Sequence, residues 1–208
     1  MKIYKINRDH PEDNLIQLAG TVVKQGGIIA FPTRCVYGLG TDAFNVDAVQ
    51  RLFQLKQRSL QKPILILIGF RTQLESLVSN VSATASRIMD AFWPGRVTLV
   101  FEAADIVPQN LTAGTGKIGI RLTGHPVAAA LCQSLGVALT GTSANISGNP
   151  GCYRIDDIEP QLIRQLDAIL NAGTLRGGTG STVVDVTGAK PKILREGEIS
   201  TNEILTLI

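Results

Sequence analysis

Residues 45–68 read NVDAVQRLFQLKQRSLQKPILILI, and this stretch combines the two periods of regular secondary structure. Asn45 is a favoured N-cap residue, and the apolar residues that follow it recur at helical spacing, which predicts a helix. The apolar run at 64–68 predicts a buried strand. A helix, a short basic loop and a buried strand in succession indicate an α/β fold.

Segments of the same two kinds alternate along the rest of the chain. Strands are predicted over 28–31, 97–101, 117–122, 137–142 and 182–186, with a further strand leading to Arg195. Helices are predicted from near Pro11, near Thr72, over 82–92, 125–135 and 155–166, and after Ser200, where Glu203 completes a capping box. With short loops and 44% hydrophobic residues, this pattern predicts one three-layer α/β domain over residues 1–208 with a twisted, mixed sheet.

Composition points to a single cytoplasmic domain. Charged residues make up 18% of the chain, and no biased run marks a linker. The N-terminal residues lack the apolar core of a signal peptide, and no run of about 18 apolar residues predicts a membrane span. The cysteines are odd in number and lack Cys-x-x-Cys spacing, which favours a reducing compartment. His10 and His125 are isolated from each other, so no protein-bound metal is predicted.

Positive charge is concentrated in one part of the sequence. The whole chain has 20 Lys and Arg against 17 Asp and Glu, but residues 48–74 contain five basic residues and no acidic one. These are Arg51, Lys56, Arg58, Lys62 and Arg71. Unpaired cations beside a buried strand predict an anion site, although a solvated basic loop would have the same composition.

Loops rich in hydrogen-bond donors follow or precede several predicted strands. They span 32–40, 140–148 and 177–182, and Arg195 ends another strand beside Glu196, which could neutralise it. None has the spacing of a P-loop or a Rossmann fingerprint, and each alone could be an ordinary turn. Together with the basic stretch, they predict a nucleotide-phosphate site.

Eight motifs in this order resemble one known family, the threonylcarbamoyl-AMP synthases built on the YrdC-type domain. They are PT at 32–33 with VYGLG at 36–40, KQR at 56–58, WPG at 93–95, IR at 120–121, HP at 125–126, SAN at 143–145 with SG at 147–148, STVVD at 181–185, and REG at 195–197. The resemblance runs almost end to end and implies the YrdC-like fold in its short, single-domain form.

The resemblance implies an adenylyl-transfer reaction. L-threonine, bicarbonate and ATP would give threonylcarbamoyl-adenylate and pyrophosphate, and a partner transferase would move the threonylcarbamoyl group to an adenosine of tRNA. The attacking carbamate comes with the substrate, so the protein needs cations and donors rather than a nucleophile and base. Mg²⁺ is expected to enter with ATP.

The resemblance also implies roles for individual residues. Lys56 and Arg58 are expected to be catalytic through the triphosphate. The predicted ATP-binding residues are Lys56, Arg58, Lys62, Lys117, Ser143, Asn145 and Arg195. The predicted threonine-binding residues are Thr33, Arg121 and Ser181, with the Arg121 guanidinium clamping the carboxylate. A salt bridge at the strand end is the alternative for Arg121.

The chain departs from the family pattern at several positions. Arg34 and Cys35 stand where Glu and often Thr follow Pro-Thr, Ser59 replaces a proline, and Arg96 replaces another. Two other functions therefore stay open. One is a paralogue that binds double-stranded RNA or tRNA without synthase activity. The other is the carbamoyl-phosphate chemistry of hydrogenase-maturation proteins, whose accompanying domains have no counterpart here.

Overall fold

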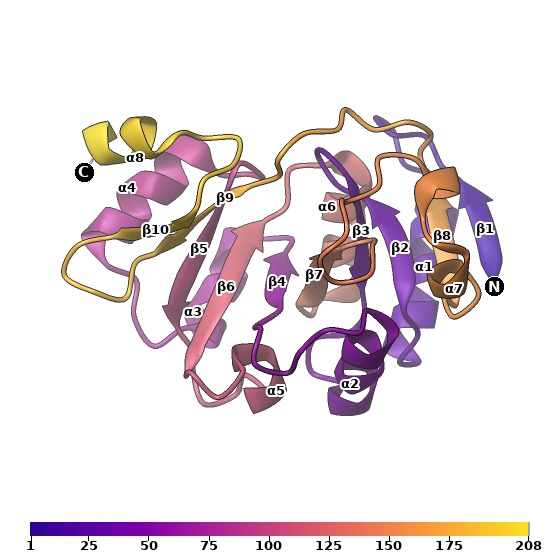
Figure 1. Ribbon diagram of the computed structural model, residues 1–208, viewed down its shortest axis with the longest axis horizontal. Coiled ribbons are helices and arrows are strands. Elements are labelled where there is room, and N and C mark those ends of the chain that lie inside the picture. Colours follow the sequence, from indigo (N-terminus) through magenta and orange to yellow (C-terminus); the bar gives the residue numbers. More distant parts are fainter. Residues whose placement is uncertain (208) are drawn as a thin grey trace.

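The computed structural model describes residues 1–207 and shows a mixed β-sheet with helices on both faces (Figure 1). Within these residues the sheet has 10 strands. In spatial order they are β1 (Lys2–Lys5), β8 (Ala168–Asn171), β2 (Ile29–Pro32), β3 (Tyr37–Gly40), β7 (Leu139–Ser143), β4 (Leu65–Ile68), β6 (Lys117–Leu122), β5 (Val97–Glu102), β9 (Thr182–Asp185) and β10 (Lys192–Arg195). Four neighbouring pairs are parallel and five are antiparallel, which confirms the predicted mixed sheet.

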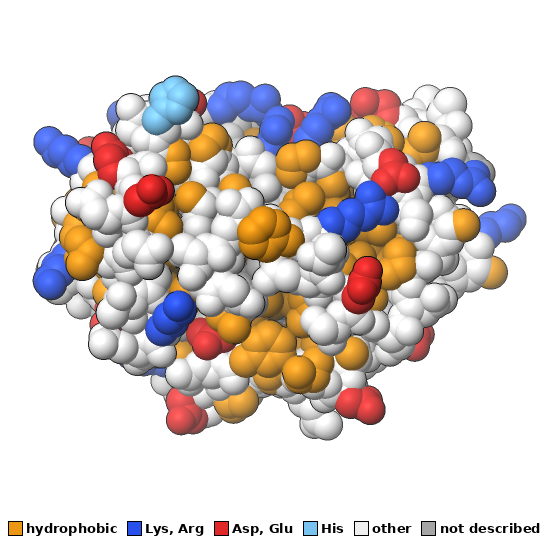
Figure 2. Space-filling view, turned by 180° about the vertical axis from the view of Figure 1, so that it is seen from behind, with side chains coloured by type: hydrophobic (Ala, Val, Ile, Leu, Met, Phe, Trp, Pro, Cys, Tyr) orange, Lys and Arg blue, Asp and Glu red, His pale blue; other side chains and the backbone are white. Residues whose placement is uncertain are grey.

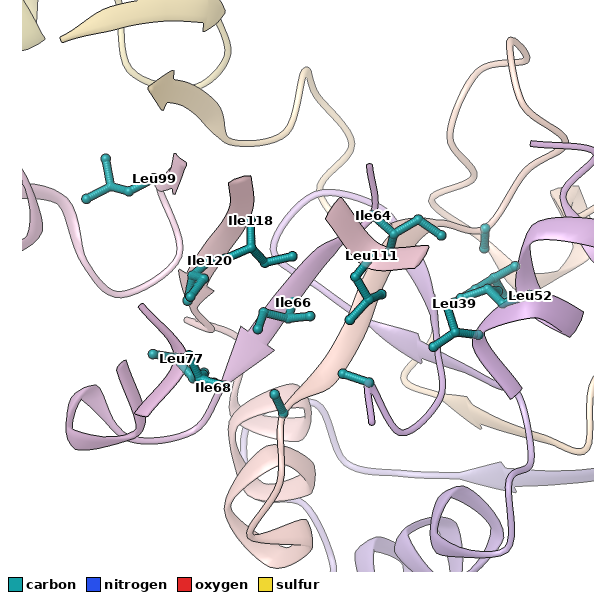
Figure 3. Packing of buried hydrophobic residues seen from close by; sticks show 14 of the residues in the cluster. Leu39, Leu52, Ile64, Ile66, Ile68, Leu77, Leu99, Leu111, Ile118 and Ile120 are labelled. Atoms are coloured by element: carbon teal, nitrogen blue, oxygen red, sulfur yellow. The ribbon is translucent and has the colours of Figure 1, made fainter. Parts of the chain in front are cut away.

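Several helices cover one face of the sheet and enclose the larger core, called here the first core. They are α2 (Val46–Leu55), α3 (Leu74–Leu77), α4 (Ala83–Phe92), α5 (Gln109–Thr112), α7 (Pro160–Ile163) and α8 (Thr201–Leu207), with 3₁₀ turns at Arg71–Gln73 and Ile155–Asp157. Figure 3 shows Ile66 of β4, Ile118 and Ile120 of β6 and Leu111 of α5 among the side chains of the first core. All four are almost completely buried.

The opposite face of the sheet is partly covered by α1 (Asp13–Lys24) and α6 (Pro126–Leu135), which enclose a second core. Successive residues of a strand point to opposite faces. On β2, Ile29 and Phe31 accordingly belong to the second core, whereas Ala30 belongs to the first. Two cores on the two faces of one sheet confirm the predicted three-layer α/β domain.

Most predicted helix starts are confirmed by their caps. The Asn45 side chain accepts a hydrogen bond from the Ala48 N–H, and Ser82 caps α4 in the same way. Ser200 and Glu203 form the predicted capping box. His125 caps α6 through Nδ1, and burial lowers the pKa of His125 to about 4.

Some element predictions are wrong. The helix predicted over 155–166 is only a 3₁₀ turn and one turn of α-helix, because Glu159 precedes Pro160 and is extended. The loop predicted over 32–40 contains β3, and β1 and β8 were not predicted.

The surface away from the cores carries charge of both signs. Figure 2 shows Lys, Arg, Asp and Glu side chains distributed over one face, with hydrophobic side chains between them. Among residues 1–207, no helix has the length and apolar character needed to cross a bilayer.

Candidate active site

A cavity of about 630 Å³ lies over the part of the sheet that α1 and α6 leave uncovered. Thr98 and Val100 of β5 line it, whereas Leu99 between them packs in the first core. The rest of the lining comes from β2, β3 and the turn between them, from the basic loop and the start of β4, and from strands β6, β7, β9 and β10 with their loops. The cavity therefore gathers segments from nearly the whole chain.

Seven of the predicted site residues meet in this cavity. They are Thr33, Arg58, Lys117, Arg121, Ser143, Ser181 and Arg195. Lys56, Lys62 and Asn145 do not line it. Residues of the donor-rich loops, the basic loop and the predicted threonine site thus line one cavity, although they are far apart in the sequence.

Arg121 of β6 lines the cavity. Its Nη1 donates to Ser181 Oγ at 2.9 Å, and Ser181 Oγ lies 2.8 Å from Thr98 Oγ1. Burial and the charge of Arg195 lower the pKa of Arg121 to about 10. Within residues 1–207 no carboxylate forms an ion pair with it, so the alternative of a strand-end salt bridge is wrong for this part of the chain.

Two further cavity arginines bind backbone carbonyls instead of acids. Arg58 donates to the carbonyls of Lys62 at 3.1 Å and Pro63 at 2.7 Å, which folds the basic loop back on itself. Arg195 donates to the Ser181 carbonyl at 2.7 Å. Burial lowers the pKa of Arg58 and of Arg195.

Glu196 does not neutralise Arg195, although the two are neighbours in the sequence. Its carboxylate accepts hydrogen bonds from the backbone N–H and hydroxyl of Thr201 at the start of α8. No carboxylate of residues 1–207 pairs with the Arg195 guanidinium, so within these residues its charge at the cavity is uncompensated.

Lys117, a predicted nucleotide-binding residue, has an acidic partner in Asp185. Its Nζ lies 3.0 Å from Asp185 Oδ2 and 2.7 Å from Thr187 Oγ1. Burial opposes ionisation of Asp185, but hydrogen bonds from Thr187 and Lys117 lower the pKa of its carboxyl group. Both Lys117 and Asp185 line the cavity.

Lys56 lies beneath the cavity wall, where it supports the loop that follows β7. It is only 1% exposed, and its Nζ donates to the carbonyls of Ser143 and Asn145, the latter at 2.6 Å. Asn145 in turn donates to the carbonyls of Ile146 and Asn149. Burial and the charge of Arg58 lower the pKa of Lys56 to about 8. Lys56 is therefore a positioning residue in this structure, and its contact with a triphosphate stays a prediction.

Sequence reasoning missed part of the cavity lining. Asp185 and Thr98 are not among the predicted site residues, and Glu198 gave no signal. In the sequence, Arg34 and Cys35 stand out only as departures from the family pattern, yet both line the cavity. Arg34 pairs with Glu198, 164 residues away, and nothing in the sequence indicates such a contact.

Comparison with known proteins identifies the family of the chain. Residues 21–197 match the Sua5/YciO/YrdC family model, described as Telomere recombination. The chain belongs to this family. As a family member it is 33% identical over 201 residues to the threonylcarbamoyl-AMP synthase of Pyrococcus abyssi, which is 97% of this chain and 59% of that protein. It is 35% identical to the synthase of Vibrio parahaemolyticus over 89% of this chain and 100% of that protein.

A solved structure gives the same fold. The structure of P. abyssi Sua5 complexed with L-threonine matches 100% of this chain and 61% of its own, with a TM-score of 0.95 and 33% identity. The chain thus spans about three fifths of the length of this neighbour. The YrdC-like fold expected from the sequence is confirmed.

Proposed function

We propose that the chain is an L-threonylcarbamoyladenylate synthase, which joins L-threonine, bicarbonate and ATP and releases pyrophosphate. One observation carries the proposal: Arg58, Arg121 and Arg195 share a cavity, and none of them has a carboxylate partner within residues 1–207. Buried or partly buried charges are normally paired. Three guanidiniums without acids fit a substrate set that brings a carboxylate, a bicarbonate and a triphosphate.

The threonine end of the cavity is assigned to Arg121, Thr33 and Ser181. Arg121 presents a planar guanidinium that can bind a carboxylate through two parallel hydrogen bonds. Its contact with Ser181 orients it, and Ser181 is held in turn by Thr98. The P. abyssi relative has been solved with L-threonine, which supports this substrate for the present chain.

The nucleotide end is assigned to Arg58, Lys117, Ser143 and Arg195, with Lys56 and Asn145 supporting the loop of Ser143. A carbamate made from threonine and bicarbonate would attack the α-phosphorus of ATP, and pyrophosphate would leave. The protein would then contribute orientation and fixed positive charge, which stabilise the added negative charge of the transition state. Lys62 and Asn145 remain predicted ATP contacts from outside the cavity lining.

Mg²⁺ belongs to this proposal as part of the Mg²⁺–ATP substrate. Among residues 1–207, no three His, Cys, Asp or Glu side chains are grouped so that they could hold a metal ion. Mg²⁺ commonly binds through substrate phosphates and few protein ligands, which suits this cavity.

The wider role follows from the product. Threonylcarbamoyl-adenylate would be consumed in the cytoplasm by a transferase that makes N6-threonylcarbamoyladenosine in tRNA. The named relatives favour the synthase over an RNA-binding paralogue without this activity. A contact with tRNA or double-stranded RNA is compatible with synthesis and is left as a secondary property.

Pyrophosphate release tests the proposal directly. The purified chain is given Mg²⁺–ATP with threonine and bicarbonate, and each is then omitted in turn. Release that requires both substrates supports the synthase. Release that is unchanged without threonine, or no release from folded protein that binds ATP, would reject it.

A further inference from the structure

Glu198 is the centre of a charge cluster at the edge of the cavity. Its carboxylate accepts from Arg34 twice, with Nη2 to Oε1 at 2.6 Å and Nε to Oε2 at 3.2 Å. It also accepts from Arg176 at 3.0 Å, and Arg96 Nε lies 4.0 Å away. Only 14% of the Glu198 side chain is exposed. One carboxylate therefore forms ion pairs with three guanidiniums.

Arg34 is built into the cavity wall beside the proposed threonine end. It follows Thr33 directly, and both line the cavity with Glu198. A Cβ atom added to Gly95 would lie 2.5 Å from Arg34 Cδ, and Gly95 has φ +91°. A side chain at position 95 would therefore displace the aliphatic part of the Arg34 side chain. Because Gly95 has no side chain, Arg34 can lie along the cavity wall.

The pairing of Arg34 determines which guanidiniums remain available to a ligand. Arg34 and Arg121 line the same cavity, and the charge of Arg34 is a minor cause of the lowered pKa of Arg121, after burial and the charge of Arg195. Without Glu198, the threonine end would present two guanidiniums, which is a receptor for two carboxylates. With Glu198, Arg34 is occupied by a bidentate contact, so its guanidinium is not available to a second carboxylate.

We infer that Glu198 determines amino-acid specificity: by holding Arg34 it leaves Arg121 as the single carboxylate receptor and excludes amino acids with an acidic side chain. The inference rests on the proposed function, since it assigns the selectivity of that same site. Specificity of this kind comes from repulsion of the wrong ligand as much as from attraction of the right one.

Calorimetric binding of L-threonine and L-aspartate, which are similar in size, tests the inference. In Glu198→Gln, the aspartate-to-threonine affinity ratio is expected to rise roughly tenfold, because a like charge is removed and Arg34 is released. Glu196→Gln is the matched control. It removes the same charge two residues away, but Glu196 binds Thr201 and no arginine. Its ratio is expected to equal that of the wild type.

The double variant Arg34→Gln with Glu198→Gln identifies the group responsible. It removes both members of the pair, so it avoids an unpaired Arg34, and the gain in aspartate binding is expected to disappear. Three outcomes would overturn the inference. The aspartate-to-threonine affinity ratio could be the same in Glu198→Gln and Glu196→Gln, or the gain in aspartate affinity could persist in the double variant. The wild type could also bind neither amino acid.

The same proteins separate this inference from the proposed function. If the ratio shifts in Glu198→Gln but wild-type pyrophosphate release does not depend on threonine, the selectivity assignment holds and the proposed reaction fails. If release depends on threonine but the ratio is unchanged, the reaction holds and the role of Glu198 fails.

Discussion

Cationic side chains of the cavity differ in what neutralises them. Arg34 and Lys117 are paired with Glu198 and Asp185 across the cavity lining. Arg58, Arg121 and Arg195 use backbone carbonyls or a hydroxyl, which orient a guanidinium without cancelling its charge. The paired cations can hold the walls, whereas the unpaired ones keep their charge for a ligand.

The substitution Arg121→Lys is expected to weaken threonine use selectively. A lysine keeps the positive charge but loses the planar fork and two-point contact with a carboxylate. We expect KM for threonine to rise roughly tenfold, equivalent to about 1.4 kcal/mol, with KM for ATP nearly unchanged. Arg154→Lys, in an exposed pair with Asp157, is the control. Equal increases in both KM values would argue against a threonine-specific role.

Lys56 is expected to make stability depend on pH. Its pKa is lowered from 10.5 to about 8 by burial first and by Arg58 second. Below pH 8 the folded and unfolded states both carry the proton, so this residue contributes no slope. Between the two pKa values the folded state binds fewer protons, so the free energy of unfolding should rise with pH.

Urea unfolding of wild type and Lys56→Met across pH 7–10 measures this contribution as a difference. The wild type is expected to gain stability relative to the variant as pH rises above about 8, because methionine has no proton to lose. A difference that stays flat across the range would show that the Lys56 amine titrates at its ordinary pKa in the folded protein.

Secondary-structure elements were predictable where their signals are local. The caps of α2, α4 and α8 and the full extent of β6 follow from neighbouring residues. β3 was not predictable, because two of its four residues are glycine. Those glycines are required by packing: a Cβ on Gly40 would lie 2.7 Å from the Thr140 carbonyl and 2.8 Å from the Phe31 ring.

The sequence predicts which residues line the cavity better than it predicts the partners that those residues contact. The family-like motifs contain six of the seven predicted residues that line the cavity, all except Lys117, because the positions of these six are fixed by short stretches of sequence. The contacts that set their roles span large separations, such as 87 residues for Lys56 with Ser143. Motifs could not indicate that Lys56 lies under the loop, since a lysine at a basic loop is normally exposed.

Helix α2 provides a test at the scale of one element. Asn45 caps its first turn, and Lys56, its C-cap residue, donates to the carbonyl of Ser143 at the end of β7. Asn45→Ala is expected to lower the free energy of unfolding by about 1 kcal/mol, and Asn45→Ser should recover most of it. Chemical denaturation of the three proteins measures both changes. An equal loss in the serine variant would mean that packing around Asn45, and not the cap, is responsible.

At the scale of the whole molecule, the cavity is lined by strands that are not neighbours in the sheet. β3 and β10 are separated by β7, β4, β6, β5 and β9 in the sheet, yet residues from both ends of this series line the same cavity. A ligand there would contact many strands at once. Ligand binding should therefore stabilise the domain as a unit.

Mg²⁺–ATP is accordingly expected to raise the stability of the whole protein. At a free concentration 100 times its Kd, the gain is about 2.7 kcal/mol, or roughly 5–10 °C in Tm for a domain of this size. Arg195→Ala should lose most of the shift at the same concentration, because it removes an unpaired cavity cation and its Kd rises. Arg154→Ala, which lies in an exposed pair, should retain it. Equal shifts in both variants would place the nucleotide away from Arg195 and would require a different nucleotide end for the cavity.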